Sequence, residues 1–210
     1  MLISDSNEFI FVHMRKVAGT SMRAILSPLR IPRSKSRIAH IKSRALLEWD
    51  YQKYAFRTHA DIRSVQKRMP ANKFARYFKF AFVRNPWDRL VSEYEFLLRK
   101  DTHGRHARVK KLGGFTQFIQ MQIPRNNAYQ INMLCDRQGE MLLDFVGKFE
   151  NLNKDWEFVC DRIGIPHQCL PRKNVTHHRH FQDYYDNESR QLVAQHWARE
   201  IDLFSYSFED

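Results

Sequence analysis

The sequence has few cysteines, no long apolar run and no repeated or low-complexity segment. Its three cysteines are odd in number and have no metal-ligand spacing, so neither a disulfide framework nor a zinc site is indicated. The apolar runs are too short for a membrane span, and no charged-then-apolar leader precedes the first apolar segment. These absences favour a protein of a reducing compartment without a transmembrane segment.

Acidic residues are scarce relative to basic ones. The chain has 35 Lys+Arg against 23 Asp+Glu, which gives a net charge of +12 with the histidines neutral. Such a surface attracts polyanions, whether nucleic acid, acidic glycans or phosphorylated small molecules. The basic residues concentrate in 29–44 and 99–111, which we interpret as basic loops flanking a site. A solvated basic surface explains either run alone, but it explains the whole imbalance less well.

The apolar residues predict an α/β fold. With 43% hydrophobic content and 16 Phe in 210 residues, the chain is expected to form a single domain over 1–210. Apolar runs predict strands in 9–14, 77–83 and 143–150. Helical spacing and end signals predict helices at 20–29, 59–69, 86–98, 115–123, 153–164 and 186–204. This alternation indicates a central parallel sheet with helices on both faces.

A phosphate-binding loop is predicted where the first strand ends, in "FVHMRKVAGTS". Ligands of such sheets bind beyond the carboxyl ends of the strands, where loops meet helix N-termini. Here the turn should leave five backbone N–H groups free, and Gly19 lets an anion approach them closely: those of Val17, Ala18, Gly19, Thr20 and Ser21. Lys16 precedes the glycine, unlike the lysine of nucleotide triphosphatase loops, so it can lean over a bound phosphate.

A second anion site is predicted where the next strand ends, in "FAFVRNPWDRL". Asn85 can cap the following helix and Pro86 can occupy its first position. Arg84 stands at the strand end, and Ser92 lies eight residues on, off the apolar stripe of the helix. Because helical side chains point back toward the N-terminus, Arg84 and Ser92 are expected to converge on an anion. Two such sites imply a ligand with two separated phosphates.

The segments "KVAGTS" and "FAFVRNPWDRLVSEY" resemble the paired cofactor motifs of the carbohydrate sulfotransferases, which include heparan sulfate 2-O and 6-O and chondroitin 4-O enzymes. The resemblance continues through "LLDFVGKFENLNKDW", "LPRKNVTHHRHFQDYYD" and "IDLFSYSFED", from about residue 8 to the C-terminus. It implies a P-loop-like three-layer sandwich and the cofactor 3'-phosphoadenosine 5'-phosphosulfate. Members often have a proline where this chain has Arg15, which we expect to alter the exit of the strand rather than the chemistry.

The resemblance also assigns roles to residues and partners. Lys16 and the amides through Ser21 would bind the 5'-phosphosulfate, and Arg84 with Ser92 the 3'-phosphate. The "NVTHHRH" segment would close over the nucleotide, with three polar residues near the adenine or 3'-phosphate: Lys173, Asn174 and Thr176. The acceptor would be a glycan or glycoconjugate, possibly anionic, rather than nucleic acid. We expect a cytoplasmic bacterial enzyme, or a Golgi lumenal one if the chain has been trimmed.

Sulfuryl transfer resembles phosphoryl transfer in needing mainly positioning and charge stabilisation. Lys16 would stabilise the oxygen left on the departing nucleotide. The acceptor hydroxyl must lose a proton, and histidine suits that task because its ordinary pKa of about 6.5 lies near working pH. His59, in "FRTHADIRSVQ", lies between the two phosphate motifs, and we predict that it is the general base. The alternative is that His59 caps the helix that opens at "ADIRSVQ".

Two other functions remain open from the sequence. A nucleotide kinase or triphosphatase would need a lysine after the second loop glycine and an acidic magnesium ligand at a strand end, where this chain has basic residues. A noncatalytic polyanion binder would explain the basic segments but would leave the two phosphate motifs unused. No metal site is expected, because the spacing of His177, His178 and His180 fits no helix-face zinc motif and no carboxylate lies near.

Overall fold

The computed structural model describes residues 1–31, 50–54, 56–171 and 179–210. The chain divides into two compact units: Met1–Val83 with Asn132–Lys173, and Arg84–Ile131 with Asn174–Asp210. The first unit contains the sheet, and the described residues of the second form helices and turns. No helix in the described ranges is both long and apolar enough to cross a membrane.

The sheet of the first unit is mixed. It contains four strands in the order β1 (Leu2–Ser4), β2 (Phe9–Val12), β3 (Phe78–Val83) and β4 (Phe145–Lys148). β2, β3 and β4 are parallel, as predicted, and β1 runs antiparallel to β2, with Leu2 opposite Phe11. The prediction of a wholly parallel sheet is therefore wrong at this edge. The four residues 5–8 turn the chain directly back, and so short a connection joins antiparallel strands.

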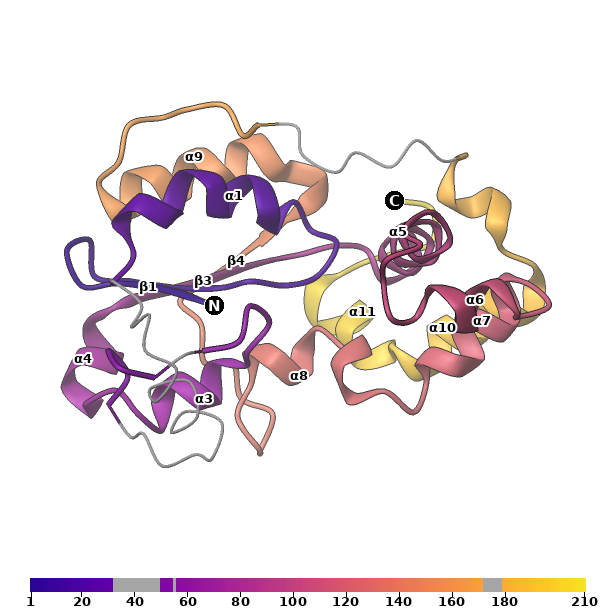
Figure 1. The fold of residues 1–210 in the computed structure, drawn as a ribbon, viewed down its shortest axis with the longest axis horizontal. Coiled ribbons are helices and arrows are strands. Elements are labelled where there is room, and N and C mark those ends of the chain that lie inside the picture. The colour runs from indigo at the N-terminus through magenta and orange to yellow at the C-terminus, as the bar shows by residue number, and fades with distance from the viewer. Residues whose placement is uncertain (32–49, 55, 172–178) are drawn as a thin grey trace. The chain divides into compact units, whose positions relative to one another are not determined.

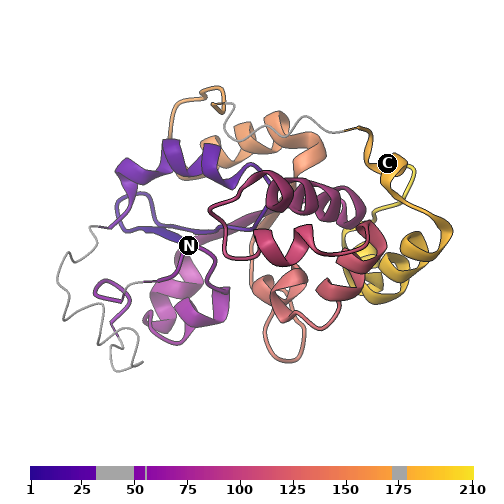
Figure 2. The same ribbon diagram turned by 45° about the vertical axis from the view of Figure 1, so that its right-hand side comes forward.

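Helices enclose the sheet of the first unit on both sides (Figures 1 and 2). One face carries α1 (Gly19–Leu26) and α9 (Leu152–Ile163), and the other carries α3 (Ile62–Gln66) and α4 (Ala71–Arg76). Phe11 and Phe80 are fully buried on neighbouring strands, and their ring centroids lie 5.2 Å apart. Aromatic residues on adjacent strands pack well across a sheet, so they fix the register that places the loop after β2 beside β3.

The predicted helix at 59–69 is shorter in the structure. Asp61 caps α3 by accepting a hydrogen bond from the Ser64 amide at 2.8 Å, and α3 covers residues 62–66. Pro70 ends this segment, as predicted, but also precedes α4, which the sequence analysis did not predict. Proline is favourable at a helix start because it lacks an N–H that would be unpaired there.

The second unit is a helical cluster around α5 (Pro86–Arg99). Asn85 caps α5 through a 3.0 Å bond from the Trp87 amide, as predicted.

The predicted final helix at 186–204 is two helices, because the chain leaves helical geometry at the buried Trp197. Segment 99–111 is also not wholly a loop, since it contains α6. The other helices of the described residues are α6 (His106–Lys110), α7 (Phe115–Gln122), α8 (Ile131–Leu134), α10 (Asn187–His196) and α11 (Ala198–Phe204), with 3-10 turns at Ser27–Leu29, Asn126–Ala128, Phe149–Asn151 and Phe181–Tyr184.

Candidate active site

The loop between β2 and α1 has an unusual backbone. Lys16 (φ 64°) and Ala18 (φ 58°) are both in the left-handed region, although neither is glycine. Alternating left-handed residues turn successive amides toward one side, an arrangement typical of anion-binding loops. The Ser21 amide differs from the prediction because it donates to the Ala18 carbonyl at 2.9 Å. Within the described residues, no group accepts a hydrogen bond from the amides of Val17, Ala18, Gly19 or Thr20.

His13, the residue after β2, lies directly beneath this loop. A Cβ atom on Gly19 would lie 2.1 Å from Cδ2 and 2.2 Å from Nε2 of His13, so only glycine fits here. His13 is 6% exposed, and its Nδ1 has no partner in the described residues. Burial, with help from His59, lowers the pKa of His13 from 6.5 to about 2, so the ring is neutral. The sequence analysis did not select His13, although its position directly after a buried strand could have marked it as a candidate site residue.

His59 lies beside His13 in the same unit. Its Nδ1 is 2.8 Å from the His13 carbonyl oxygen, and the two ring centroids are 4.7 Å apart. A carbonyl can only accept, so Nδ1 carries the proton and Nε2 of the neutral ring is left as the proton acceptor. Burial lowers the pKa of His59, and the hydrogen bond to His13 opposes this shift, while Arg15 and Arg23 add to it. His59 does not cap α3, because Asp61 does.

Arg84 belongs to the second unit and is tightly held there. Its side chain bonds to Asp88 twice, with Nε and Nη2 each 2.6 Å from Oδ2. Gln130 bonds to both backbone groups of Arg84. Its Oε1 accepts from the Arg84 amide at 3.0 Å, and its Nε2 donates to the Arg84 carbonyl at 2.9 Å. Arg84 is 8% exposed and Gln130 is 2% exposed, so these bonds are shielded from water. We call this arrangement the Gln130 clamp.

Glu200 in α11 orients the Gln130 clamp. Its Oε2 accepts from Gln130 Nε2 at 3.1 Å, and its Oε1 accepts from the Ile131 amide at 3.2 Å. Glu200 is 1% exposed, and burial raises the pKa of its carboxyl, with Arg89 opposing this shift. The sequence analysis missed Gln130 and Glu200 because they lie far from Arg84 along the chain and match no motif.

Ser92 and Arg89 share α5 with Asp88. Ser92 is 2% exposed, two helical turns beyond Arg84, and Asp88 occupies the intervening turn. The carboxylate of Asp88 therefore lies at the predicted anion site of Arg84 and Ser92, where it holds the Arg84 guanidinium. Arg89 bonds to the Ala128 carbonyl and lies 3.8 Å from Glu93.

Three of the predicted cofactor residues, Lys173, Asn174 and Thr176, lie outside the described residues. So do His177, His178 and most of the basic segment 29–44. Across the part of the chain that the structure describes, no three His, Cys, Asp or Glu side chains are grouped to hold a metal ion.

The chain belongs to the sulfotransferase family. The family model described as "Sulfotransferase family" matches residues 1–207. Among the individual relatives, carbohydrate sulfotransferase 14 of Danio rerio is 26% identical over 204 residues, covering 83% of this chain and 51% of the relative. Carbohydrate sulfotransferase 11 of the same fish is 25% identical over 203 residues, covering 78% and 53%.

An uncharacterised protein of Archaeoglobus fulgidus is 29% identical over 113 residues, which cover 53% of this chain and 88% of that protein. The chain spans about half the length of the two carbohydrate sulfotransferases that it matches. No solved structure is significantly similar to it.

Proposed function

We propose that this chain transfers a sulfuryl group from 3'-phosphoadenosine 5'-phosphosulfate to a hydroxyl of a glycan or another sugar-containing acceptor. In this proposal residues 1–210 act as one P-loop-like sulfotransferase domain. The observation that carries the proposal is the loop between β2 and α1, where the amides of residues 17–20 have no acceptor among the described residues, in a chain of the sulfotransferase family. The names of the two fish relatives support a carbohydrate acceptor.

The residues of the chain fit this cofactor. The amides of residues 17–20, with Lys16 at their start, suit the 5'-phosphosulfate, because backbone N–H groups in such loops hold phosphate oxygens. Arg84 and Ser92 are the proposed ligands of the 3'-phosphate, where Asp88 would hold the guanidinium in one orientation. Three further ligands are proposed on the sequence resemblance alone: Lys173, Asn174 and Thr176.

When bound, the cofactor supplies an activated sulfuryl group on its 5'-phosphate. Lys16 would then stabilise the negative charge that develops on the phosphate oxygen, since a fixed cation in a water-poor site stabilises charge strongly. Nε2 of His59 would accept the proton of the acceptor hydroxyl, because the bond from Nδ1 to His13 leaves Nε2 unprotonated. His13 would hold the tautomer and the orientation of His59 through its backbone carbonyl.

Calorimetric binding of nucleotides tests the cofactor site. Adenosine 3',5'-bisphosphate should bind the wild-type protein much more tightly than ADP or 5'-AMP. Arg84→Ala should remove this preference, and Arg137→Ala, which removes an exposed arginine, should retain it. Equal binding of the three nucleotides, or tighter binding of ADP, would contradict the proposal and favour a nucleotide kinase.

A transfer assay with a panel of glycan acceptors tests the general base. His59→Ala should lose transfer and keep the affinity for adenosine 3',5'-bisphosphate, because His59 would act on the acceptor. His196→Ala, which removes an exposed histidine of α10, is the matched control and should behave as wild type. Near-normal transfer by His59→Ala would show that another group is the base.

A further inference from the structure

Two hydrogen bonds join residues 58–59 to the chain on either side of the loop between β2 and α1. Before the loop, the His13 carbonyl accepts the bond from His59 Nδ1 at 2.8 Å. After it, Arg23 in the second turn of α1 donates from Nη1 to Thr58 Oγ1 at 3.3 Å. Thr58 directly precedes His59, so the candidate base is tied to both ends of the proposed phosphate site.

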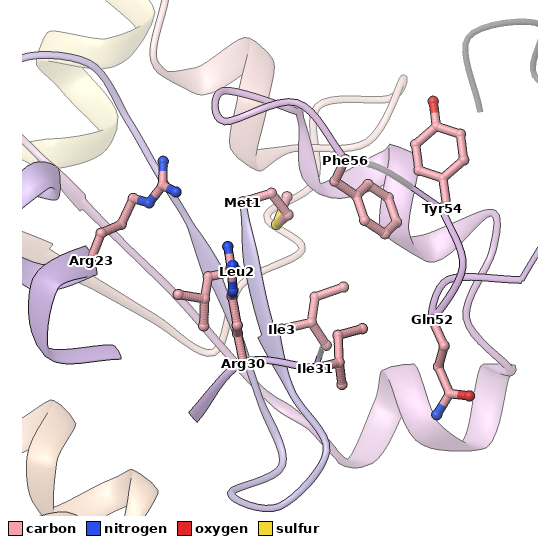
Figure 3. Close-up of a pocket in the computed structure, with 9 residues that line it drawn as sticks. All are labelled: Met1, Leu2, Ile3, Arg23, Arg30, Ile31, Gln52, Tyr54 and Phe56. Carbon is pink, nitrogen blue, oxygen red and sulfur yellow. The ribbon is translucent and has the colours of Figure 1, made fainter. Parts of the chain in front are cut away.

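Arg23 has no carboxylate that would hold its guanidinium elsewhere. Its side chain is half-buried, and among the residues that the structure describes it forms no ion pair with Asp or Glu. The hollow beside β1 that Arg23 also lines has a volume of about 30 Å³ (Figure 3). Such a volume holds about one or two water molecules and no larger ligand. The hydroxyl of Thr58 is therefore the protein group to which we assign this guanidinium.

The bond from Arg23 restrains the backbone directly before His59. A hydrogen bond from a charged donor contributes more than a neutral one, and partial burial strengthens it. The restraint matters because the bond from His59 Nδ1 to a carbonyl decides which ring nitrogen carries the proton. A neutral imidazole that loses such a bond can carry its proton on either nitrogen.

Arg23 also acts on His59 through its charge. Burial lowers the pKa of His59, and three positive groups add to this shift: Arg15, the Met1 amino group and Arg23. The bond to the His13 carbonyl opposes it. Only the neutral ring can accept a proton, so the charge of Arg23 favours the same form of His59 as its bond to Thr58 does.

We propose that Arg23 is a positioning residue: through Thr58 it holds His59 at a fixed place beside the loop between β2 and α1. This inference rests on the proposed function, in which His59 accepts the proton of the acceptor hydroxyl. Arg23 lies on α1, whose first residues belong to the proposed phosphate site. The base and the phosphate ligands would thus keep their distance when the loop adjusts to the cofactor, although Arg23 itself touches neither cofactor nor acceptor.

Nuclear magnetic resonance of the histidine rings tests this role without an acceptor. The full chain is isotopically labelled in its histidines, and the signals of His59 are identified by their absence in His59→Ala. In mildly alkaline buffer the wild-type protein should show His59 neutral and protonated on Nδ1 alone. Thr58→Val keeps the shape of the side chain and removes the hydroxyl, so this single tautomer should be lost. Arg23→Met should have the same effect.

The two variants differ in charge, which separates the bond from the electrostatic effect. Arg23→Met removes a cation, so the pKa of His59 should rise and the ring should gain its second proton at a higher pH than in wild type. Thr58→Val keeps the cation and should not raise this pKa. Thr102→Val and Arg137→Met, at exposed sites, are the matched controls and should retain the wild-type tautomer and pKa.

Turnover with a glycan acceptor gives an independent measurement. Each single variant should lower turnover by about tenfold, as expected for the loss of a hydrogen bond to a charged group. The double variant of Arg23→Met and Thr58→Val should lose about as much as one single variant, because both changes remove the same bond. Independent effects would instead multiply to about 100-fold.

Two outcomes would overturn the proposal. The first is a His59 tautomer that is unchanged in both variants, and the second is a double variant whose loss of turnover is the product of the single losses. Thr58→Val is the milder change, and its tautomer decides the question even if Arg23→Met is poorly folded.

The same proteins separate a failure of this inference from a failure of the proposed function. Affinity for adenosine 3',5'-bisphosphate should be unchanged in every variant, because neither Arg23 nor Thr58 is a proposed ligand. A wild-type protein that does not prefer the bisphosphate, or a His59→Ala protein with near-normal transfer, contradicts the proposed function. A protein that binds the bisphosphate, but whose His59 tautomer does not depend on Arg23 or Thr58, refutes the inference alone.

Discussion

The two predicted phosphate sites are built in opposite ways. In the loop after β2, the backbone itself forms the site: two left-handed residues turn the amides outward, and glycine gives them room above His13. At Arg84, the side chain is the binding group, and residues distant in sequence hold it, through Asp88 on the guanidinium and Gln130 on the backbone. The first kind of site tolerates little change at one glycine, whereas the second depends on buried polar partners.

Adding one methyl group should break the backbone-built site. In Gly19→Ala the new Cβ would overlap the His13 ring, so the loop must move, and a displacement of about 1 Å costs roughly 100-fold in function. We expect calorimetry to show at least a ~100-fold loss of affinity for adenosine 3',5'-bisphosphate. Gly104→Ala is the control, because no atom lies within 4 Å of its added Cβ. Wild-type affinity in Gly19→Ala would contradict the proposed loop site.

Removing the side chain of Lys16 should show what its charge contributes to turnover, apart from the contribution of the loop backbone. Lys16→Ala keeps a non-glycine residue at φ 64°, so the backbone should hold its form while the cation is lost. We expect turnover to fall by about 10² to 10³, the usual effect of removing one group that stabilises developing charge. Thermal unfolding should change little. Lys110→Ala, at an exposed site in α6, should leave turnover unchanged, and an active Lys16→Ala would exclude the proposed role.

Breaking the Gln130 clamp should weaken the side-chain-built site without touching Arg84. Gln130→Leu removes the bonds to both backbone groups of Arg84 and leaves Glu200 without one donor, at a cost of roughly 1–3 kcal/mol for each buried unpaired group. We expect ~10-fold weaker binding of adenosine 3',5'-bisphosphate, with the affinity for 5'-AMP unchanged. A general loss of structure would weaken both nucleotides.

Two further variants sharpen that measurement. Gln191→Leu makes the same substitution at an exposed position of α10 and should have no effect on either nucleotide. Glu200→Gln keeps the shape of the side chain but lets its amide present a donor to Gln130, so it should reproduce part of the loss. Equal weakening of both nucleotides in Gln130→Leu would refute a positioning role.

The last prediction concerns the stability of the fold and His13 beneath the loop. Its pKa is lowered to about 2 in the folded protein, so between about 2 and 6.5 the unfolded chain binds a proton that the folded chain does not. Stability should therefore fall as pH decreases below 6.5, by up to about 1.4 kcal/mol per pH unit from this residue. Urea unfolding from pH 8 to pH 4 should show a flatter profile for His13→Gln than for wild type. His196→Gln should keep the wild-type slope.

Local signals predicted much of the fold. The strands β2, β3 and β4 followed from apolar runs, and α5 followed from Asn85 and Pro86, whose effects act within one helical turn. The strand β1 was missed because its three residues, Leu2–Ser4, are too few to carry a periodic signal. The break at Trp197 was also missed, since it depends on burial and on a 3.2 Å bond from its ring to the Ala128 carbonyl. Contacts between distant residues decide such features.

The candidate site shows the same limit. Gly19, Lys16 and His59 were predicted as site residues because each lies in a motif or between two motifs. The carbonyl of His13 that orients His59 was not found, because backbone atoms carry no identity in the sequence. Gln130 and Glu200 are ordinary residues at unremarkable positions, and their importance comes from burial beside Arg84. The roles of all these residues stay predictions until the variants are measured.

The path of the chain has a practical consequence for protein engineering. The backbone passes between the two units at 83–84, at 131–132 and at 173–174, so each unit is assembled from separated stretches of sequence. No single truncation can therefore deliver either unit intact. Isolating one for study would need circular permutation, and chimaeras with relatives would need several matched junctions, of which the first falls between the last residue of β3 and Arg84.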